Sequence, residues 1–300
     1  MTLQIASAPV SWGITESVAF PPEYPYSRVL DEIAGAGYAA TELGPYGFLP
    51  TDPVTLQQEL EQRNLTLCSA FVAFPLGTAA AHSDGFAHVR RTAVLIGQAG
   101  CRLLILSDEV CAERSASAGR PKEAAQRSWT DTEWEIAERA VKEVIRQCAG
   151  HGMEVAIHHH VGTHVETPDE VERMLAMFSA DELGLCFDTG HYLYGGGDPI
   201  DFVGRYGKRI RCAHLKDISA SRLSSVRSMG LDFYAAVRYG VFASLGEGDI
   251  DFAKVVDALR SLQFQGWAVV EQDVLAGGRG ADTPLANATA ARHFLLQLGY

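Results

Sequence analysis

Short apolar runs alternate along the chain with longer runs in which apolar residues recur every three or four positions. The short runs are rich in β-branched and aromatic residues and predict buried strands, whereas the periodic runs predict amphipathic helices. We predict eight strands, at residues 4–8, 38–43, 65–71, 102–106, 153–158, 183–187, 210–215 and 266–270. Each is followed by a predicted helix, at residues 27–36, 52–63, 85–99, 131–149, 168–178, 199–206, 252–262 and 284–298.

Several of these helices carry a start signal in the sequence. Asp52, Thr167 and Asp198 each precede a proline, which combines a capping side chain with the residue favoured at the first helical position. Ser27 is the expected cap of the first helix, and Gly37 is expected to end it. Residues 219–248 show neither periodicity, so we predict a long irregular segment there.

The regular order of strand and helix predicts parallel strands joined by right-handed helical crossovers. Eight such units favour a closed (β/α)₈ TIM barrel over an open doubly wound sheet. No G-x-G-x-x-G follows the first strand, which argues against a dinucleotide-binding sheet. We find no linker, so we expect residues 1–300 to form one domain. The segment 219–248 is expected to be a lid over the site, and a contact between subunits of a homo-oligomer is an equally good interpretation.

Composition narrows the class of protein further. Hydrophobic residues make up 47% and charged residues 21% of the 300 residues, as in a soluble globular protein. The net charge of −12 disfavours nucleic acid as a partner. No apolar run reaches the roughly 18 residues of a membrane helix, and the first residues do not resemble a signal peptide. Six cysteines stand singly, without a C-x-x-C pair, so we expect free thiols and a cytoplasmic location.

Residues with metal-ligand chemistry end four consecutive predicted strands, the fifth to the eighth. Functional groups lie at the carboxyl ends of barrel strands, so we expect these residues to share one site. The expected ligands of a divalent metal are His158, Asp188, His214 and Glu271. Imidazole nitrogen with carboxylate oxygen suits Mn, Fe, Co or Zn, whereas oxygen alone would suit Mg or Ca. Side chains alternate along a strand, so His160 faces the same side as His158 and is the alternative ligand, whereas His159 faces away.

Three more residues are candidates for proton transfer or for positioning a substrate: Lys216, His191 and Glu42. Lys216 lies two residues after His214 and therefore faces inward, and His191 lies three residues after Asp188. A lysine in a barrel mouth needs a carboxylate or an anionic substrate group beside it. The structural alternative is a buried ion pair between Lys216 and either Glu42 or Asp217.

Five short runs together resemble those of inosose dehydratases, enzymes of inositol catabolism within the xylose-isomerase-like barrel superfamily. The runs are Ala156-Ile-His-His-His-Val-Gly-Thr163, Phe187-Asp-Thr-Gly-His191, His214-Leu-Lys-Asp217, Leu245-Gly-Glu-Gly-Asp-Ile-Asp251 and Val270-Glu-Gln-Asp273. The resemblance implies a Mn- or Co-dependent lyase that acts on a cyclic polyhydroxy ketone, with Zn, Fe or Mg as alternative metals. The family's metal positions fall directly on Asp188, His214 and Glu271.

Two positions depart from the pattern that the resemblance implies. Many superfamily members have glutamate where His158 ends the fifth strand. Inosose dehydratases tend to have Asn-Asp-Asp after the tryptophan that corresponds to Trp12, whereas this chain has Gly-Ile-Thr-Glu there. That loop is expected to line the substrate pocket, so the substrate can differ. We expect Trp12, His160 and Asp217 to contact the substrate, a small polyol or sugar.

The resemblance implies a reaction in which the metal polarises a ketone, a base removes the α-proton and an acid assists loss of the β-hydroxyl. The first alternative is a sugar (phosphate) isomerase or ketose epimerase with the same metal site. Its epimerases use two glutamates as opposed bases, and His158 in place of one of them argues against it. A phosphodiesterase such as an apurinic endonuclease would need a basic groove. A non-catalytic sugar-binding barrel would not need Lys216 and His191 beside the ligands.

Overall fold

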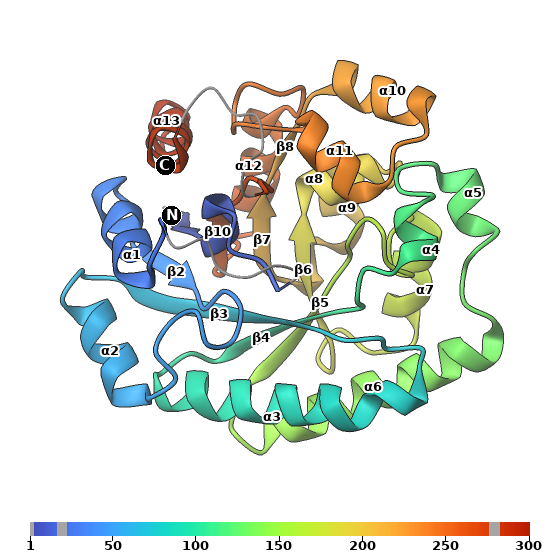
Figure 1. Cartoon of the computed structure of the whole chain (residues 1–300), viewed down its shortest axis with the longest axis horizontal. Coiled ribbons are helices and arrows are strands. Elements are labelled where there is room, and N and C mark those ends of the chain that lie inside the picture. Colours follow the sequence, from blue (N-terminus) through green and yellow to red (C-terminus); the bar gives the residue numbers. More distant parts are fainter. Residues whose placement is uncertain (1–2, 17–22, 276–282) are drawn as a thin grey trace.

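The computed structural model describes residues 3–16, 23–275 and 283–300. Eight parallel strands close into a barrel, in which the first strand pairs with both the second and the last (Figure 1). The barrel strands are β1 (Gln4–Ser7), β2 (Ala40–Glu42), β3 (Thr66–Ala73), β4 (Leu103–Ser107), β5 (Glu154–His158), β6 (Gly184–Asp188), β7 (Ile210–Leu215) and β10 (Trp267–Val270). The predicted (β/α)₈ barrel is therefore confirmed, and each strand overlaps a predicted one.

Helices surround the strands and supply the crossovers. The eight that connect successive strands or close the chain are α1 (Tyr26–Gly35), α2 (Pro53–Glu61), α3 (His82–Gln98), α6 (Asp131–Ala149), α7 (Pro168–Ala176), α9 (Pro199–Tyr206), α12 (Phe252–Ser261) and α13 (Pro284–Gln297). Asp52, Thr167 and Asp198 cap their helices through the side chain, as predicted. Ser27 does not cap α1, because that helix begins at Tyr26 after an extended Pro25 and has no side-chain cap.

The segment 219–248 is not irregular, contrary to the prediction. It folds into α10 (Ala220–Met229) and α11 (Phe233–Tyr239), which are capped by Ser219 and Asp232. Gly230 and Gly240 end these helices with φ of 63° and 83°, a conformation that glycine adopts without strain. The strand β9 (Phe242–Ala243) then pairs antiparallel with β8 (Asp217–Ile218). Each helix is short and its apolar stripe is correspondingly brief, so the caps were the only clear signal.

Shorter helical pieces occupy the loops at the carboxyl ends of the strands. They are α4 (Ala112–Ser115), α5 (Pro121–Ala125), α8 (Thr189–Tyr194) and the 3₁₀ turns Pro9–Trp12 and Ala79–Ala81. A third 3₁₀ turn, Gly207–Arg209, directly precedes β7 at the other end of the barrel. The helix α8 begins directly at the end of β6, where Asp188 accepts a hydrogen bond from the backbone N–H of His191 at 2.8 Å. Asp188 therefore ends a strand and caps a helix at once, which fixes one of its two carboxylate oxygens.

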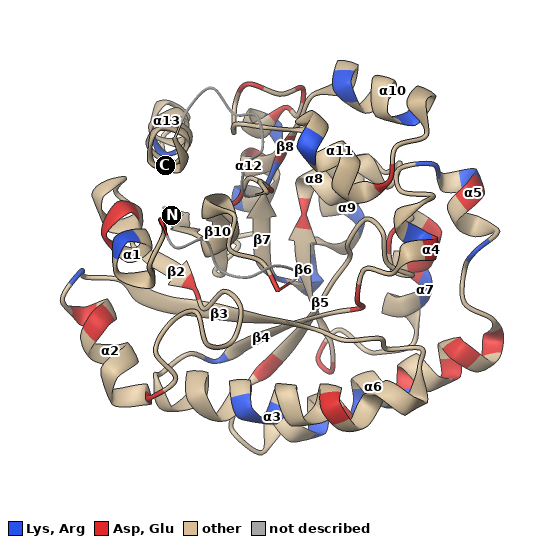
Figure 2. Ribbon diagram, viewed as in Figure 1, with Lys and Arg blue, Asp and Glu red and all other residues tan. Residues whose placement is uncertain are grey.

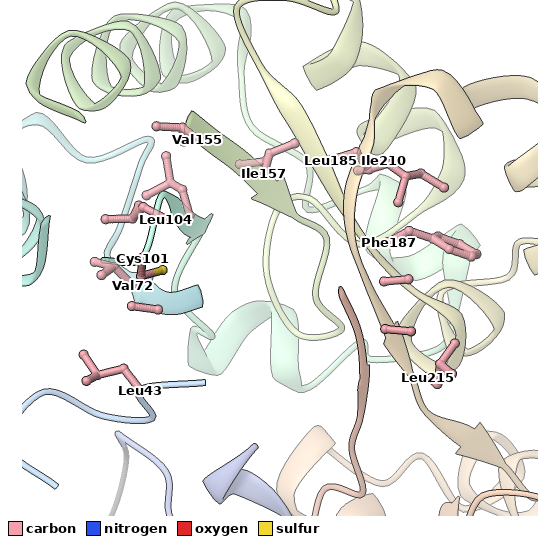
Figure 3. Close-up of a cluster of buried hydrophobic side chains, with 14 of the residues drawn as sticks. Leu43, Val72, Cys101, Leu104, Val155, Ile157, Leu185, Phe187, Ile210 and Leu215 are labelled. Carbon is pink, nitrogen blue, oxygen red and sulfur yellow. The ribbon is translucent and has the colours of Figure 1, made fainter. Parts of the chain in front are cut away.

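Alternation along the strands divides the core into an outer layer and a lumen. Val155 and Ile157 of β5, with Leu185 and Phe187 of β6, pack in the large cluster between strands and helices (Figure 3). The residues between them belong to a second cluster inside the barrel, made largely of small side chains: Ala6, Ala40, Cys68, Ile105, Ala156, Cys186, Cys212 and Val269. These small side chains fill the narrow interior of the barrel. The next layer, toward the carboxyl ends of the strands, can therefore hold polar side chains.

Charged residues of both signs are spread over the outer helices (Figure 2). Within the described residues, no helix is both long and apolar enough to cross a membrane. All six cysteines are free thiols, as predicted.

A buried arginine ties the loop after β5 to the helices beside it. Arg114 has no exposed surface; its guanidinium donates to the carbonyl oxygens of Thr163 (2.7 Å) and Ala124 and to the Glu170 carboxylate (2.8 Å). Glu166 lies 3.8 Å from the same guanidinium and accepts the backbone N–H groups of Gly119 and Gly162. Burial raises the pKa of Glu166 to about 7, despite these hydrogen bonds. The conformation of the loop that follows the three histidines thus depends on the buried guanidinium of Arg114.

Replacing Arg114 by methionine is expected to lower the free energy of unfolding by about 3–5 kcal/mol, because it leaves buried carboxylates without their partner. The measurement is urea denaturation at pH 7.5, followed by circular dichroism. Arg139→Met is the matched control, because Arg139 is exposed and its ion pair with Glu135 is long, at 4.0 Å. Equal unfolding free energies for the two variants would contradict the role given to Arg114.

Candidate active site

A cavity of about 240 Å³ opens at the carboxyl ends of the barrel strands. Its polar wall is formed by side chains at strand ends: Glu42, Asp108, Glu109, His158, His160, His214, Lys216, Glu271 and Asp273. Its apolar wall combines Phe71 of β3 with Phe233, Tyr234 and Val237 of α11. The segment that was expected to be a lid therefore contributes one wall of the cavity. A cavity with one apolar and one polar side suits a ring that carries hydroxyl groups.

Three of the four predicted metal ligands meet at the base of this cavity. The ligand atoms of Asp188, His214 and Glu271 all lie within 4.8 Å of one another, and the three residues are at most 6% exposed. His214 Nδ1 lies 3.0 Å from Glu271 Oε2 and 3.8 Å from Asp188 Oδ2. The register pairs Asp188 directly with His214 across β6 and β7. Strand geometry alone therefore brings these two side chains together.

His158 lies beside this cluster, with Nε2 3.6 Å from Asp188 Oδ2. Burial lowers the pKa of His158 well below its ordinary value, so the ring is neutral and keeps a lone pair. The buried atoms His158 Nδ1, Asp188 Oδ2 and His214 Nδ1 make no hydrogen bond within the described part of the chain. Buried polar atoms without hydrogen bonds are uncommon in folded proteins, and a group of them can mark the place where an ion binds. Nitrogen and carboxylate donors of this kind fit a divalent transition metal.

Glu42, predicted as a catalytic residue, lies behind His214 and touches it directly. Its Oε1 accepts hydrogen bonds from His214 Nε2 at 2.9 Å and from Ser69 Oγ at 2.8 Å. Nε2 therefore carries a hydrogen, and Nδ1 is the ring nitrogen that faces Asp188 and Glu271. Although burial opposes it, the nearby Glu271 and Glu42 help to raise the pKa of His214 well above its ordinary value, so a metal ion at Nδ1 would displace a proton from this ring. Carboxylates that orient a ligand histidine in this way are common at metal centres. Ser69 was missed, because a serine inside an apolar strand gives no local signal of its partner.

Lys216 faces the cavity, as alternation predicted, but neither of its expected partners holds it. Its ammonium lies 3.1 Å from Asp188 Oδ2, 3.2 Å from Glu271 Oε2 and 2.7 Å from Asp273 Oδ1. Although burial alone would lower it, these carboxylates hold the pKa of Lys216 well above its ordinary value. Asp273 was not predicted as a site residue, although it lies two positions after Glu271 and so shares its side. Burial opposes ionisation of Asp273, and Lys216 and His191 overcome it and lower the pKa of this carboxyl.

Two residues expected to contact the substrate lie outside the cavity wall. Trp12 is 2% exposed and packs in the outer core, where its indole N–H donates to Glu32 at 2.6 Å. Asp217 accepts backbone N–H groups from Ile218 and from the loop 246–250, so it shapes that loop. The physical reason is the same for both residues. The indole N–H of Trp12 and the carboxylate of Asp217 already have hydrogen-bond partners within the protein, so they do not face the cavity. His160, the third, does line the cavity.

The three consecutive histidines divide as alternation predicts. His159 turns away from the cavity and packs against Phe187, Tyr192 and Phe202, with its Nε2 accepting the backbone N–H of Asp188. His158 and His160 both line the cavity. His191, also predicted, is fully buried, and its Nε2 lies 3.0 Å from Lys216 Nζ and 3.4 Å from Asp273 Oδ2.

Glu16 is a further cavity residue that the sequence did not single out by itself. It lies at the mouth, in the loop after Trp12. Although its side chain reaches solvent, the surrounding protein raises the pKa of Glu16 to about 7, mainly by desolvation, with smaller contributions from Glu42 and Glu271. The loop in which the chain departs from the dehydratase pattern therefore does contribute to the pocket, as expected.

Beneath the ligand cluster lie two thiols of the lumen. Cys186 and Cys212 are paired in register on β6 and β7, one level below Asp188 and His214. Neither has exposed surface, and each thiol sulfur lies within 4.8 Å of a ring nitrogen of His214. They form the floor of the site and separate it from the apolar interior of the barrel.

Comparison with known proteins agrees with this architecture. A family model described as "Xylose isomerase-like TIM barrel" matches residues 30–295. The inosose dehydratase of Geobacillus kaustophilus (strain HTA426) is 32% identical over 270 residues, which are 90% of this chain and 87% of that protein. The rhizopine catabolism protein MocC of Rhizobium meliloti is 31% identical over 277 residues, 91% of this chain and 82% of that protein.

A solved structure of the IOLI protein with a binding zinc atom superposes with a TM-score of 0.70, at 14% identity over 99% of this chain and 98% of that chain. At this level of identity, the match shows a shared fold. Together with the barrel and the cluster at its strand ends, these similarities show the family of the protein. The chain belongs to the xylose isomerase-like TIM barrel family, in which it is an inosose dehydratase-like enzyme.

Proposed function

We propose that this chain is a metal-dependent hydro-lyase that removes water from a cyclic polyhydroxy ketone of the inosose type. The observation that carries the proposal is the buried cluster of Asp188, His214 and Glu271 at the ends of neighbouring strands. It stands in a chain 32% identical to an inosose dehydratase over 90% of its length. The reaction needs a base for an acidic C–H bond, a group that stabilises the resulting oxyanion, and exclusion of bulk water.

We assign the metal to Asp188, His214 and Glu271, with His158 as the fourth ligand. The fit rests on the nitrogen and carboxylate donors of this set and on its buried atoms without hydrogen bonds. When bound, a divalent ion would act as a Lewis acid on the ketone oxygen. Manganese and cobalt are our first choices, and the zinc atom in the IOLI protein adds zinc as a candidate.

The residues of the chain itself would balance charge, donate and accept hydrogen bonds, and contact the apolar face of the substrate. Lys216 supplies a buried positive charge within 3.2 Å of three carboxylates, so it limits the repulsion among them and offers N–H donors to substrate oxygens. Phe71 and Phe233 line the cavity and would give the C–H face of a ring an apolar surface. Glu16 and Glu109 also line it and would accept hydrogen bonds from hydroxyl groups. The apolar residues of α11 on this side of the cavity would limit the access of water, which would strengthen the charge interactions inside it.

The test is a spectrophotometric assay with scyllo-inosose on metal-stripped protein, with and without added Mn²⁺. The expected result is an absorbing diketone product only when Mn²⁺ is present. Glu271→Ala should lose bound metal and turnover together, whereas Glu247→Ala, at an exposed position, should keep both. Isomerisation of the ketone without loss of water would instead identify a sugar isomerase or epimerase. Full activity of Glu271→Ala would refute the ligand assignment.

Glu42→Ala is expected to weaken metal binding by about 10–100-fold, because His214 loses the partner that fixes its tautomer. Glu42→Gln should weaken it less, since an amide oxygen still accepts the Nε2 hydrogen. The measurement is competition with a chromophoric chelator, which needs no substrate. An unchanged affinity in Glu42→Ala would mean that the ring of His214 is held by its other neighbours.

Lys216→Met should leave one metal bound per chain but lower kcat by about 10²–10⁴-fold, the range expected for a lost proton donor or charge. The reason is that the variant removes the ammonium and keeps all four proposed ligands. Metal content by elemental analysis and turnover are both measured, with Lys254→Met as the exposed control. Wild-type turnover in Lys216→Met would demote Lys216 to a structural ion pair.

A further inference from the structure

Two imidazoles near the cavity and outside the ligand set, those of His160 and His191, both contact a single residue, Val161. His160 Nδ1 lies 2.7 Å from the carbonyl oxygen of Val161. A carbonyl oxygen only accepts hydrogen bonds, so the hydrogen of this ring is on Nδ1. Its Nε2 then carries the lone pair. His160 lines the cavity, so this lone pair belongs to a ring that substrate can reach.

His191 is held by the other side of the same residue. The backbone N–H of Val161 lies 3.3 Å from His191 Nδ1, and an N–H group only donates. The lone pair of His191 is therefore on Nδ1, and its hydrogen is on Nε2. That hydrogen faces Asp273 Oδ2 at 3.4 Å. The two rings, with centroids 3.8 Å apart, are thus fixed in opposite tautomers by one residue.

Lys216 fits this assignment, although its Nζ is 3.0 Å from His191 Nε2. An ammonium can turn its hydrogens toward Asp273 Oδ1 at 2.7 Å and Glu271 Oε2 at 3.2 Å, whereas the backbone N–H of Val161 has a fixed direction. The assignment for His191 therefore follows the fixed donor. Asp273 contacts both groups, with Oδ1 on Lys216 and Oδ2 on His191. The carboxylate of Asp273 therefore contacts the ammonium of Lys216 and the ring of His191 at the same time.

The other imidazoles around the site offer no accessible lone pair. His214 uses Nε2 on Glu42, and its Nδ1 faces the ligand cluster. His158 Nδ1 has no exposed surface, and its Nε2 faces Asp188. His191 has no exposed surface at all. Among the described residues that line the cavity, only His160 combines a free ring lone pair with access to the space for a substrate.

We propose that His160 is the general base that removes the α-proton of the substrate, and that Val161 is the residue that fixes it in the required tautomer. The inference rests on the proposed dehydration. The C–H bond breaks, its proton goes to His160 Nε2, and its electron pair forms an enolate. The enolate electrons then form the double bond between the α and β carbons while the β C–O bond breaks. The leaving oxygen takes the proton from His160 and departs as water, which returns His160 to its neutral form.

The tautomers are tested directly and without substrate. Protein labelled with ¹⁵N-histidine, metal-free and zinc-loaded, is examined by long-range ¹H–¹⁵N correlation at pH 8. His160→Gln and His191→Gln assign the signals. We expect the hydrogen on Nδ1 for His160 and on Nε2 for His191. A hydrogen on Nε2 of His160 would overturn the inference whatever the activity of the enzyme.

The role of His160 is tested by α-proton exchange of inosose in D₂O, followed by NMR together with product formation. His160→Gln should lower both exchange and dehydration by at least about 100-fold while keeping its metal. His191→Gln should keep exchange within about tenfold of wild type, because His191 does not take the proton. His293→Gln, at an exposed helical position, is the matched control and should behave as wild type.

These outcomes separate the two proposals. Wild-type protein that binds metal but dehydrates no inosose refutes the proposed function. Active wild-type protein with exchange within threefold in His160→Gln refutes His160 as the base. Exchange lost in His191→Gln and kept in His160→Gln would assign the base to His191 instead. Thermal unfolding of both variants, with Tm within a few degrees of wild type, excludes loss of fold as the cause.

Discussion

The burial of charge at the carboxyl ends of the strands is the constraint on which the rest of the site depends. Lys216 and its three carboxylate partners are almost completely removed from solvent, and Glu42 lies beside them. Buried charges are costly unless each is paired and hydrogen-bonded. Here the described carboxylates outnumber the fixed ammonium, so the cluster favours further positive charge. Glu271 and Glu42 accordingly help to raise the pKa of His214 although burial opposes this, and a bound cation would meet the same need.

The barrel makes such a cluster possible because its strand ends lie at one level. Cys186 pairs with Cys212 and Asp188 with His214, so residues two positions apart on neighbouring strands stack in layers. The lower layer is small and apolar, and the upper layer is polar. A strand and a loop then add the second set of contacts: Ser69 of β3 lies behind Glu42, and Val161 of the loop after β5 lies between His160 and His191. Strands thus place the charges, whereas loop peptides set the protonation of the neutral rings.

Sequence patterns predicted the barrel, most element positions and the groups at the strand ends, because those depend on periodicity and on alternation. The division of the three histidines followed from alternation alone. Asp273 could have been found by the same rule, two residues after Glu271. Trp12 and Asp217 could not be excluded, because their partners are distant in sequence, such as Gly248 for Asp217. The helices α10 and α11 were missed because short elements are defined by caps more than by apolar stripes. The cytoplasmic location stays a prediction.

The insertion between β7 and α12 has a consequence for how such a protein can change over time. Its helices α10 and α11 pack on each other, and Asp217 gathers the backbone of its closing loop. The wall that faces a substrate, Phe233 and Tyr234, is carried on this insertion, whereas the groups that bear charge are carried on the barrel. Part of the surface that would face a substrate is therefore encoded in a different stretch of the gene from the charged groups at the strand ends. Recombination or drift in one stretch can alter which ring is accepted while the machinery at the strand ends is inherited intact.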